Sequence, residues 1–340
     1  MFRLKTATTF AALLLASTAT VPALAQTTPG EGTEIILAQP TWDTGWFQAE
    51  IFRQMFQELG YTVNKPLTLD NPAFYQSVAF GDVTLWVDAW FPIHNPYKQA
   101  FEGSAEIVGP VVSGGAMEGY LIDKASAEKF GITSLEDFKR DDVKAAFDRN
   151  GDGKADMVAC PPGWGCELTI EHHMNAYDLN DDINLIKAGY PAAMADAVAS
   201  YESGSPILFY TWTPNWTVNE LVPGEDVVWI EVPEINLPEE MADIADAATR
   251  EGVVGCVSDP CKLGFPANSI DAVANSAFLA DNPAVRALLD AVEIPIEDVY
   301  AQNAAMNAGD GDIEAQATAW IEDNRAVVDS WLEAARGAAS

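Results

Sequence analysis

The chain has 340 residues, of which 49% are hydrophobic and 20% charged, and its formal net charge is −33 at pH 7. A polyanion of this size repels nucleic acid, which argues against nucleic acid as a partner. The hydrophobic content is that of a globular protein and excludes a disordered chain. We attribute the acidity to a solvating surface.

The N-terminus, MFRLKTATTFAALLLASTATVPALAQ, has the pattern of a secretory signal peptide. Arg3 and Lys5 precede an apolar run too short to span a membrane, and Ala23 to Ala25 supply a cleavage site. Cleavage after Ala25 takes the net charge from −33 to −35, because residues 1–25 carry two basic and no acidic side chains. No cysteine lies at the cut and no later run has 18 apolar residues, so we expect an exported, soluble protein without a lipid anchor.

Four cysteines form two close pairs, Cys160 with Cys166 and Cys256 with Cys261. In an exported chain this pattern predicts two local disulfides. The alternative is one metal site that uses all four thiolates, although neither spacing is CxxC. Loops this short stabilise a chain by about 2–3 kcal/mol each, and we expect them to fix loop geometry.

The hydrophobic pattern of the N-terminal part predicts alternating strands and helices. Residues 34–38 are typical of a buried strand, and residues 45–60 place apolar side chains at helical spacing. A strand is expected at 61–69, followed within 71–90 by a helix, a turn and another strand. This alternation predicts an α/β sandwich with mostly parallel strands.

The pattern then restarts, which predicts a second lobe. Strand and short helices are expected in 113–139 and further strands at 205–216 and 226–233, whereas 233–262 is predicted to be irregular. A strand at 264–275 and a helical tail complete the chain. We expect two α/β lobes joined by a hinge with a ligand cleft between them. The expected boundaries are 26–115 and 246–340 for the first lobe and 116–245 for the second.

Several of the ten tryptophans lie where predicted strands end. In DVTLWVDAW, alternation puts Trp86, Asp88 and Trp90 on one face, and in ILFYTWTPNW Tyr210 and Trp212 share a face. Both strands end in Trp-x-Pro, which places the last tryptophan at the strand terminus, where ligands of α/β sheets bind.

A third tryptophan, Trp164, lies on the short loop between Cys160 and Cys166. We interpret Trp90, Trp164 and Trp212 as the walls of a shared pocket; the alternative is that each fills the core. An aromatic box suits a quaternary ammonium, which has no N–H to donate and is held by ring faces at about 0.5–2 kcal/mol each.

Seven motifs resemble, in order and spacing, those of the glycine betaine/proline betaine substrate-binding proteins of Gram-negative osmoprotectant ABC importers. They are GYTVNKP, DAWFPIH, EGYLIDK, DRNGDGKAD, PPGWGCE, FYTWTPNW and PGEDVVW. The resemblance implies a type II periplasmic binding protein-like fold and a monomeric, periplasmic protein that is not an enzyme. It also implies capture of a methylated ammonium ligand and its delivery to an ABC permease and ATPase, with no cofactor.

The resemblance also assigns site residues. The family's box tryptophans correspond to Trp90, Trp164 and Trp212, its carboxylate-pairing histidine to His94, and its carboxylate-binding amides to Gly165 and Cys166. The sequence after Cys166 is helical in pattern, so these amides would lie at a helix N-terminus, which binds anions. The alternative for His94 is a histidine on a surface loop.

Two departures from the family pattern bear on the ligand. Glu118 stands where the family typically has glutamine, and a carboxylate there would favour a compact cationic head or a protonated oxygen. Trp42, Trp46 and Trp86 are extra tryptophans, of which we expect Trp42 and Trp86 to contact the ligand in a more enclosed pocket. Trimethylamine N-oxide is therefore the alternative ligand, ahead of dimethylsulfoniopropionate and choline.

The motif DRNGDGKAD has the spacing of an EF-hand calcium loop. Asp148, Asn150, Asp152, Lys154 and Asp156 occupy loop positions 1, 3, 5, 7 and 9. The bidentate glutamate of position 12 is missing, because alanine stands there. The sequence therefore predicts either a structural Ca²⁺ or an Asx-rich turn without metal, in both cases bracing the tryptophan loop.

A secreted hydrolase is the rival from another functional class, since tryptophans and carboxylate pairs also serve glycosidases. No motif supports it: Glu171-His172-His173 lacks HExxH spacing, and GxSxG does not occur. A calcium-dependent adhesion module would show internal repeats, and none are found.

Overall fold

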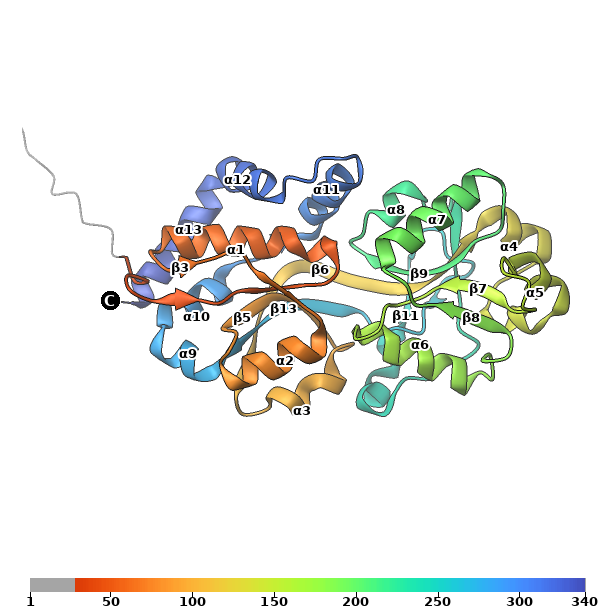
Figure 1. Cartoon of the computed structure of the whole chain (residues 1–340), viewed down its shortest axis with the longest axis horizontal. Helices are drawn as coiled ribbons and strands as arrows, with labels where there is room; N and C mark the ends of the chain where they lie inside the picture. Colours follow the sequence, from red (N-terminus) through yellow and green to blue (C-terminus); the bar gives the residue numbers. More distant parts are fainter. Residues whose placement is uncertain (1–27, 340) are drawn as a thin grey trace, which may run out of the picture.

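The computed structural model describes residues 28–339, so the expected signal peptide at 1–25 lies outside the described residues. Figure 1 shows two α/β lobes with two long strands crossing between them. β6 (Ala105–Asp123) leads from the first lobe to the second, and β13 (Asn268–Asn275) leads back. The expected two-lobed α/β fold is confirmed.

The first lobe, on the left in Figure 1, contains both ends of the described chain. Before β6 its elements are β1 (Glu34–Ile35), β2 (Ala38–Pro40), η1 (Asp43–Gly45), α1 (Trp46–Glu58), β3 (Thr62–Val63), β4 (Leu67–Leu69), α2 (Asn71–Phe80), β5 (Leu85–Phe91), η2 (Asn95–Tyr97) and α3 (Lys98–Phe101). After β13 they are α9 (Ser276–Asp281), α10 (Pro283–Ala291), β14 (Ile294–Pro295), α11 (Ile296–Asn307), α12 (Ile313–Asp323) and α13 (Arg325–Ala338).

The second lobe, on the right, is formed by the chain between the two crossing strands. Its elements are α4 (Lys124–Phe130), η3 (Leu135–Lys139), α5 (Asp141–Phe147), β7 (Ala155–Val158), α6 (Gly165–Ala176), β8 (Ile183–Ile186), α7 (Tyr190–Glu202), β9 (Leu208–Thr213), α8 (Thr217–Glu220), β10 (Val227–Ile230), η4 (Glu239–Ala248), β11 (Thr249–Arg250) and β12 (Cys261–Lys262).

The main sheet runs through both lobes in the strand order β5-β13-β6-β9-β7-β8, with β10 and β14 also paired to β6. The pairs β5–β13, β13–β6 and β6–β9 are antiparallel, whereas β7 is parallel to β8 and β9. The N-terminal strands for which parallel pairing was predicted do pair in parallel with one another: β1 with β3, β2 with β4, and Leu37 with Leu85 of β5. The antiparallel centre of the main sheet was not predicted, and it arises because the two crossing strands run in opposite directions and pair with each other.

The segment after β10 stays with the second lobe. β11 pairs with β12, and Trp229 of β10 forms a bridge with Cys256. The return to the first lobe then follows on β13, later in the chain than the expected boundary at residue 246. We therefore propose to place both lobe boundaries within the crossing strands β6 and β13.

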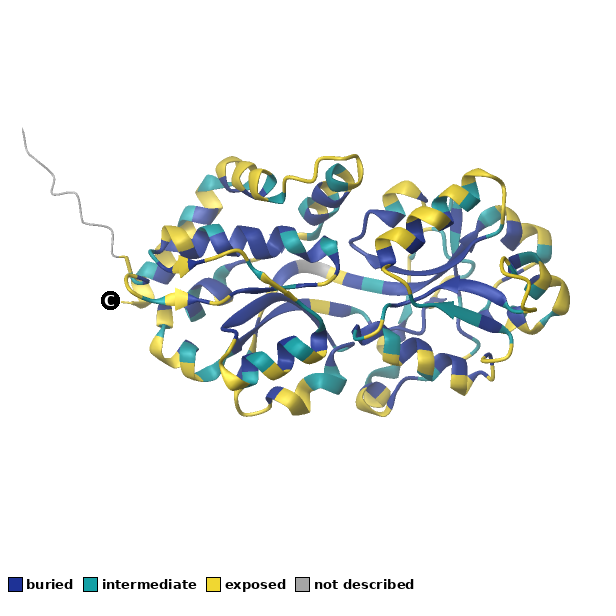
Figure 2. Cartoon of the chain, viewed as in Figure 1, coloured by how far each residue is buried: buried dark blue, intermediate teal, exposed yellow. Residues whose placement is uncertain are grey.

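Figure 2 shows that the strands are buried beneath exposed helix faces. All seven residues of β5 are buried, and α1 buries Phe52, Met55 and Phe56 at helical spacing. This helix ends before Gly60, whose φ of 92° lies in the left-handed region. No helix within residues 28–339 is long and apolar enough to cross a bilayer.

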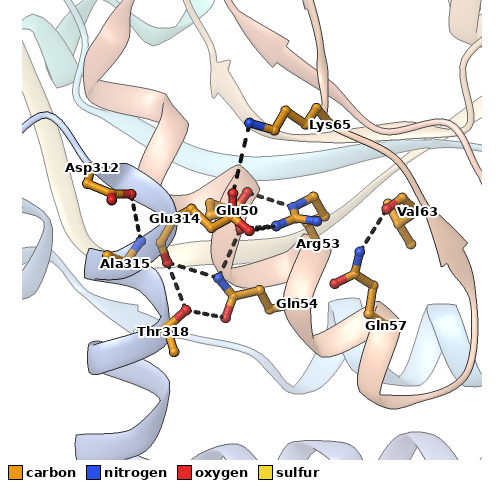
Figure 3. A network of polar contacts seen from close by, with 10 residues as sticks. All are labelled: Glu50, Arg53, Gln54, Gln57, Val63, Lys65, Asp312, Glu314, Ala315 and Thr318. Carbon is orange, nitrogen blue, oxygen red and sulfur yellow. Dashed lines mark hydrogen bonds and ion pairs between the residues drawn. The ribbon is translucent and has the colours of Figure 1, made fainter.

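A polar network fastens helix α12, the last helix but one, onto α1 (Figure 3). Arg53 and Glu50 form a bidentate pair with N···O distances of 2.7 and 2.6 Å, and Arg53 also reaches Glu314 of α12 at 3.0 Å. Gln54 donates to Glu50 and accepts from Thr318 Oγ1. Helix α12 is thereby fixed to α1 of the first lobe.

Candidate functional site

A small cavity lies where the two lobes meet. Its lining residues come from both lobes and from β6: Trp42, Trp90, Ile93, His94, Glu118, Trp164, Gly165, Cys166, Tyr210 and Trp212. The centre of a water molecule can occupy about 30 Å³ of it. Since one water needs roughly 10–15 Å³ by this measure, the cavity suits a compact solute.

Four indoles converge on this cavity, two from each lobe. Trp42 follows β2 and Trp90 is near the end of β5, while Trp164 precedes α6 and Trp212 is near the end of β9. The Trp164 ring packs edge-on against Trp42 and Trp212, with centroid distances of 5.2 and 5.5 Å. The side chains are 4–7% exposed, so the predicted pocket of three tryptophans is assembled and has a fourth wall.

The indole N–H groups of the four walls are bound by the protein. Trp42 and Trp90 donate to the two carboxylate oxygens of Asp88. Trp164 donates to Thr41 Oγ1 at 2.8 Å and Trp212 donates to Thr44 Oγ1 at 3.3 Å, and both of these bonds join the two lobes. Sequence reasoning placed Asp88 on the face of Trp90 but missed this role and missed both threonines.

The Trp164 loop is held by covalent and polar contacts. Cys160 and Cys166 form one disulfide, and Cys256 and Cys261 form the other, so both predicted pairings are confirmed. The four-thiolate metal site is excluded because all four sulfurs are paired. The N–H of Gly163 donates to Glu167 at 2.8 Å, which ties the loop to the first turn of α6.

Helix α6 begins at the cavity. Its first residues, Gly165 and Cys166, line the cavity, and the preceding Trp164 offers no side-chain cap for their N–H groups. Uncapped N–H groups at a helix N-terminus attract anions. Gly165 also allows a close approach, because a Cβ there would lie 2.7 Å from Cδ2 of His94.

His94 lies between the cavity and the core of the first lobe, and it is 2% exposed. Its Nδ1 is 2.7 Å from the Tyr75 hydroxyl and its Nε2 is 2.9 Å from Nδ2 of Asn71. Burial lowers the pKa of His94 to about 3. The imidazole is therefore neutral at physiological pH.

Two buried carboxylates lie at or beside the cavity. Glu118 of β6 lines it and accepts hydrogen bonds from the Tyr210 hydroxyl and from Asn268 Nδ2, the latter at 2.6 Å. Burial raises the pKa of Glu118 to about 7, although both hydrogen bonds oppose the rise. Burial likewise raises the pKa of Asp88 to about 7 against the hydrogen bonds from Trp42 and Trp90.

Two extra tryptophans lie outside the cavity lining. Trp86 was predicted to contact the ligand, but it is fully buried and stacks on Phe74 with a centroid distance of 4.1 Å. It supports Trp42 from behind through an edge contact at 5.7 Å. Trp46 donates to the Pro40 carbonyl. Conversely, Ile93 and Tyr210 line the cavity although the predicted ligand contacts did not include them.

The EF-hand-like loop forms a turn stabilised by its own backbone. The Asp148 carboxylate accepts N–H bonds from Gly151, Asp152 and Gly153, which lower the pKa of Asp148. Asp156 accepts from Asn150 and from the Arg149 N–H. Within residues 28–339 no group of three or more acidic, His or Cys side chains is arranged to hold a metal. The Asx-rich turn is therefore formed by the loop's own hydrogen bonds, and a structural Ca²⁺ in this loop stays a prediction.

The domain-family comparison agrees with the geometry of this site. A family model described as the substrate binding domain of ABC-type glycine betaine transport systems matches residues 33–323. The chain belongs to this family. Its members are substrate-binding transport proteins, which agrees with the expectation from the sequence motifs.

Relatives match this chain over nearly its whole length. The glycine betaine-binding periplasmic protein OusX of Dickeya dadantii is 40% identical over 316 residues, which cover 92% of each chain. The glycine betaine/proline betaine-binding periplasmic protein of Salmonella typhimurium is 38% identical over 337 residues, covering 98% of this chain and 97% of the relative.

A solved structure shares the fold. Lactococcal OpuAC, in a closed conformation complexed with glycine betaine, superposes with a TM-score of 0.67 at 22% identity. The match covers 88% of this chain and 99% of that one. The two-lobed fold is therefore that of the type II periplasmic binding proteins.

Proposed function

We propose that this chain captures glycine betaine, or a closely related methylated ammonium compound, between its lobes and delivers it to an ABC permease and its ATPase. It acts in the periplasm as a monomer, after removal of residues 1–25. The observation that carries this proposal is the convergence of four indoles from two lobes on one small cavity.

The chemistry of the cavity suits a methylated cation. Among the described residues that line it, none is Lys or Arg, and the one charged side chain is the carboxylate of Glu118. A trimethylammonium group has no N–H to donate and gains attraction from each ring face, about 0.5–2 kcal/mol when desolvated. An ammonium group with three N–H donors loses more by desolvation, because the indole faces offer no acceptors and Glu118 is the one carboxylate in the lining.

The opposite end of a zwitterion has its own partners. The N–H groups of Gly165 and Cys166 at the start of α6 supply an anion site for a ligand carboxylate. His94 lies beside them and is neutral, so it cannot form an ion pair with a carboxylate. Because its two ring nitrogens already contact Tyr75 and Asn71, a hydrogen bond from His94 to the ligand would have to replace one of these contacts. Closure of the lobes brings these groups and the indoles onto one ligand.

Trimethylamine N-oxide is the second candidate, and Glu118 favours it. A buried carboxyl group that holds its proton near neutral pH can donate to the single oxygen of an N-oxide. The same group, once ionised, opposes the carboxylate of glycine betaine in a cavity of low dielectric. The small cavity also favours the more compact ligand. Dimethylsulfoniopropionate is one methylene longer than glycine betaine, and choline has a hydroxyl in place of the carboxylate, so each matches the site less completely.

Titration of the wild type and Glu118→Gln with glycine betaine and trimethylamine N-oxide tests this proposal. We expect saturable quenching of tryptophan fluorescence and a raised melting temperature with at least one ligand. A preference for the N-oxide that disappears in Glu118→Gln assigns that ligand; a preference for glycine betaine that is unaffected by the substitution assigns the other. If neither ligand in large excess changes fluorescence or melting, the proposal is wrong.

A further inference from the structure

Asp88 connects two walls of the cage without reaching the cavity itself. It lies on β5, is 1% exposed, and accepts the indole N–H of Trp42 in a short bond of 2.5 Å and that of Trp90 in a longer one of 3.4 Å. The backbone before α1 packs directly on it, because a Cβ at Gly45 would lie 2.2 Å from Oδ2 of Asp88. Its position is therefore fixed from both sides.

These hydrogen bonds orient the indoles. The N–H edge of an indole carries partial positive charge and its ring face carries negative charge. An indole that turned its N–H edge into the cavity would repel a cationic ligand, whereas one held by its N–H from behind presents its face. A carboxyl group suits this task because its two oxygens can face two donors, and above its pKa of about 7 Asp88 is ionised and its bonds are about twice as strong as neutral ones.

The same loop carries the acceptors of the second lobe's tryptophans. Thr41 and Thr44 flank Trp42 in sequence, and they accept the N–H groups of Trp164 and Trp212 across the cleft. Because Asp88 fixes Trp42, it also helps to fix the neighbouring hydroxyls of Thr41 and Thr44. These hydroxyls accept the indole N–H groups of the second lobe when the lobes meet.

We propose that Asp88 is a positioning residue that holds Trp42 and Trp90 as one unit, withdraws their N–H edges from the cavity, and thereby sets the preference for methylated cations. The proposal rests on the proposed function for its effect on binding. Its effect on the indole N–H groups is independent of which ligand binds.

The test compares Asp88→Asn with Asp271→Asn. Asp271 is also a buried acid, lies beside Ala89 in the same sheet, and bonds Ser269 rather than an indole. Asparagine keeps one acceptor but turns an amide N–H₂ toward the other indole. We expect affinity for glycine betaine or trimethylamine N-oxide, whichever the wild type binds, to fall about tenfold or more in Asp88→Asn, with Asp271→Asn unchanged.

Indole ¹⁵N–¹H spectra, assigned with Trp42→Phe and Trp90→Phe, give a readout that a general loss of packing would not produce. We expect two signals that are protected from solvent exchange in the wild type, are shifted in Asp88→Asn, and are unmoved in Asp271→Asn. Unshifted signals, or unchanged affinity in a folded Asp88→Asn protein, would overturn the proposal.

Two further outcomes remain decisive. If Asp88→Asn does not fold, the wild-type spectra decide, because rapid solvent exchange at the Trp42 and Trp90 indoles contradicts the bonds to Asp88. If the wild type binds neither ligand, the proposed function fails, and the indole signals alone decide whether Asp88 holds the two rings.

Discussion

The two halves of the tryptophan cage are positioned by different physical means. In the first lobe, Trp42 and Trp90 share the buried carboxylate of Asp88. In the second lobe, Trp164 lies on a loop closed by a disulfide, and Trp212 lies on a central strand. The hydrogen bonds to Asp88 are directional but depend on whether Asp88 is ionised. The disulfide holds the Trp164 loop independently of any titrating side chain. The comparison shows that one aromatic surface can combine a titratable support with a covalent one.

The largest expected effect is the loss of the second-lobe wall in Trp164→Ala. The substitution removes a ring that contacts Trp42 and Trp212 and, in the proposed site, the ligand. We put the loss at about 4 kcal/mol, or about 1000-fold in affinity. Calorimetric titration measures it. Trp320→Ala is the control: Trp320 lies on α12, does not line the cavity, and its loss should leave the affinity unchanged. An equal loss in both variants would contradict a specific role for Trp164.

The pH dependence of the free energy of unfolding tests the protonation of Glu118, which lies on β6, the strand that runs through both lobes. The folded chain keeps the Glu118 proton up to about pH 7, whereas the unfolded chain releases it near the ordinary pKa of 4.5. The Glu118 contribution to the free energy of unfolding therefore falls as pH rises from 4.5 to 7, by at most about 3 kcal/mol.

Glu118→Gln should remove this fall, while Asp88 titrates equally in both proteins. Denaturant unfolding of wild type and variant between pH 4.5 and 7.5 measures the difference. A constant difference between the two curves across that range would show that Glu118 is not a buried titrating group.

The two disulfides offer a matched pair for the covalent support. Replacing Cys160 and Cys166 together by Ser should lower the free energy of unfolding by about 2 kcal/mol and also weaken ligand binding, because Trp164 loses its fixed loop. The disulfide between Cys256 and Cys261 closes a loop of similar length away from the cavity. The same double replacement there should lower the free energy of unfolding but leave ligand binding unchanged. Similar ligand affinity in both double variants would show that the Trp164 loop keeps its position without the Cys160–Cys166 disulfide.

The smallest expected effect is that of calcium. The carboxylate of Asp148 is already engaged by backbone N–H groups, so adding Ca²⁺ or a chelator should not change the melting temperature. Thermal melts with 1 mM-scale Ca²⁺ or chelator, on the order of ordinary extracellular site affinities, measure this. A saturable rise in melting temperature with Ca²⁺ would mean that the loop around Asp148, which precedes the Trp164 loop, binds a metal ion.

Much of the site was predictable because its residues lie at recognisable positions in the chain. Trp90 and Trp212 precede prolines at strand ends, and Trp164 lies between two cysteines, so local patterns place all three. Trp86 was misplaced because alternation along β5 assigns a face but not whether that face meets the cavity or Phe74.

The supporting residues were less predictable because their contacts join distant parts of the chain. Thr41 meets Trp164 and Thr44 meets Trp212 only when the two lobes come together. The antiparallel centre of the sheet was missed for the same reason. Local patterning indicates strands, but the pairing of β6 with β13 is set by the return of the chain from the second lobe.

The central claim is that a cage of indole faces selects methylated ammonium groups, and a comparison of glycine betaine with glycine tests it most directly. The two molecules differ only in the three methyl groups that replace N–H donors. Isothermal calorimetry of the wild-type protein should show saturable binding of glycine betaine and none of glycine at the same concentration, because the indole faces offer no acceptors and Glu118 alone cannot satisfy three N–H groups. Equal binding of both, or tighter binding of glycine, would contradict the account.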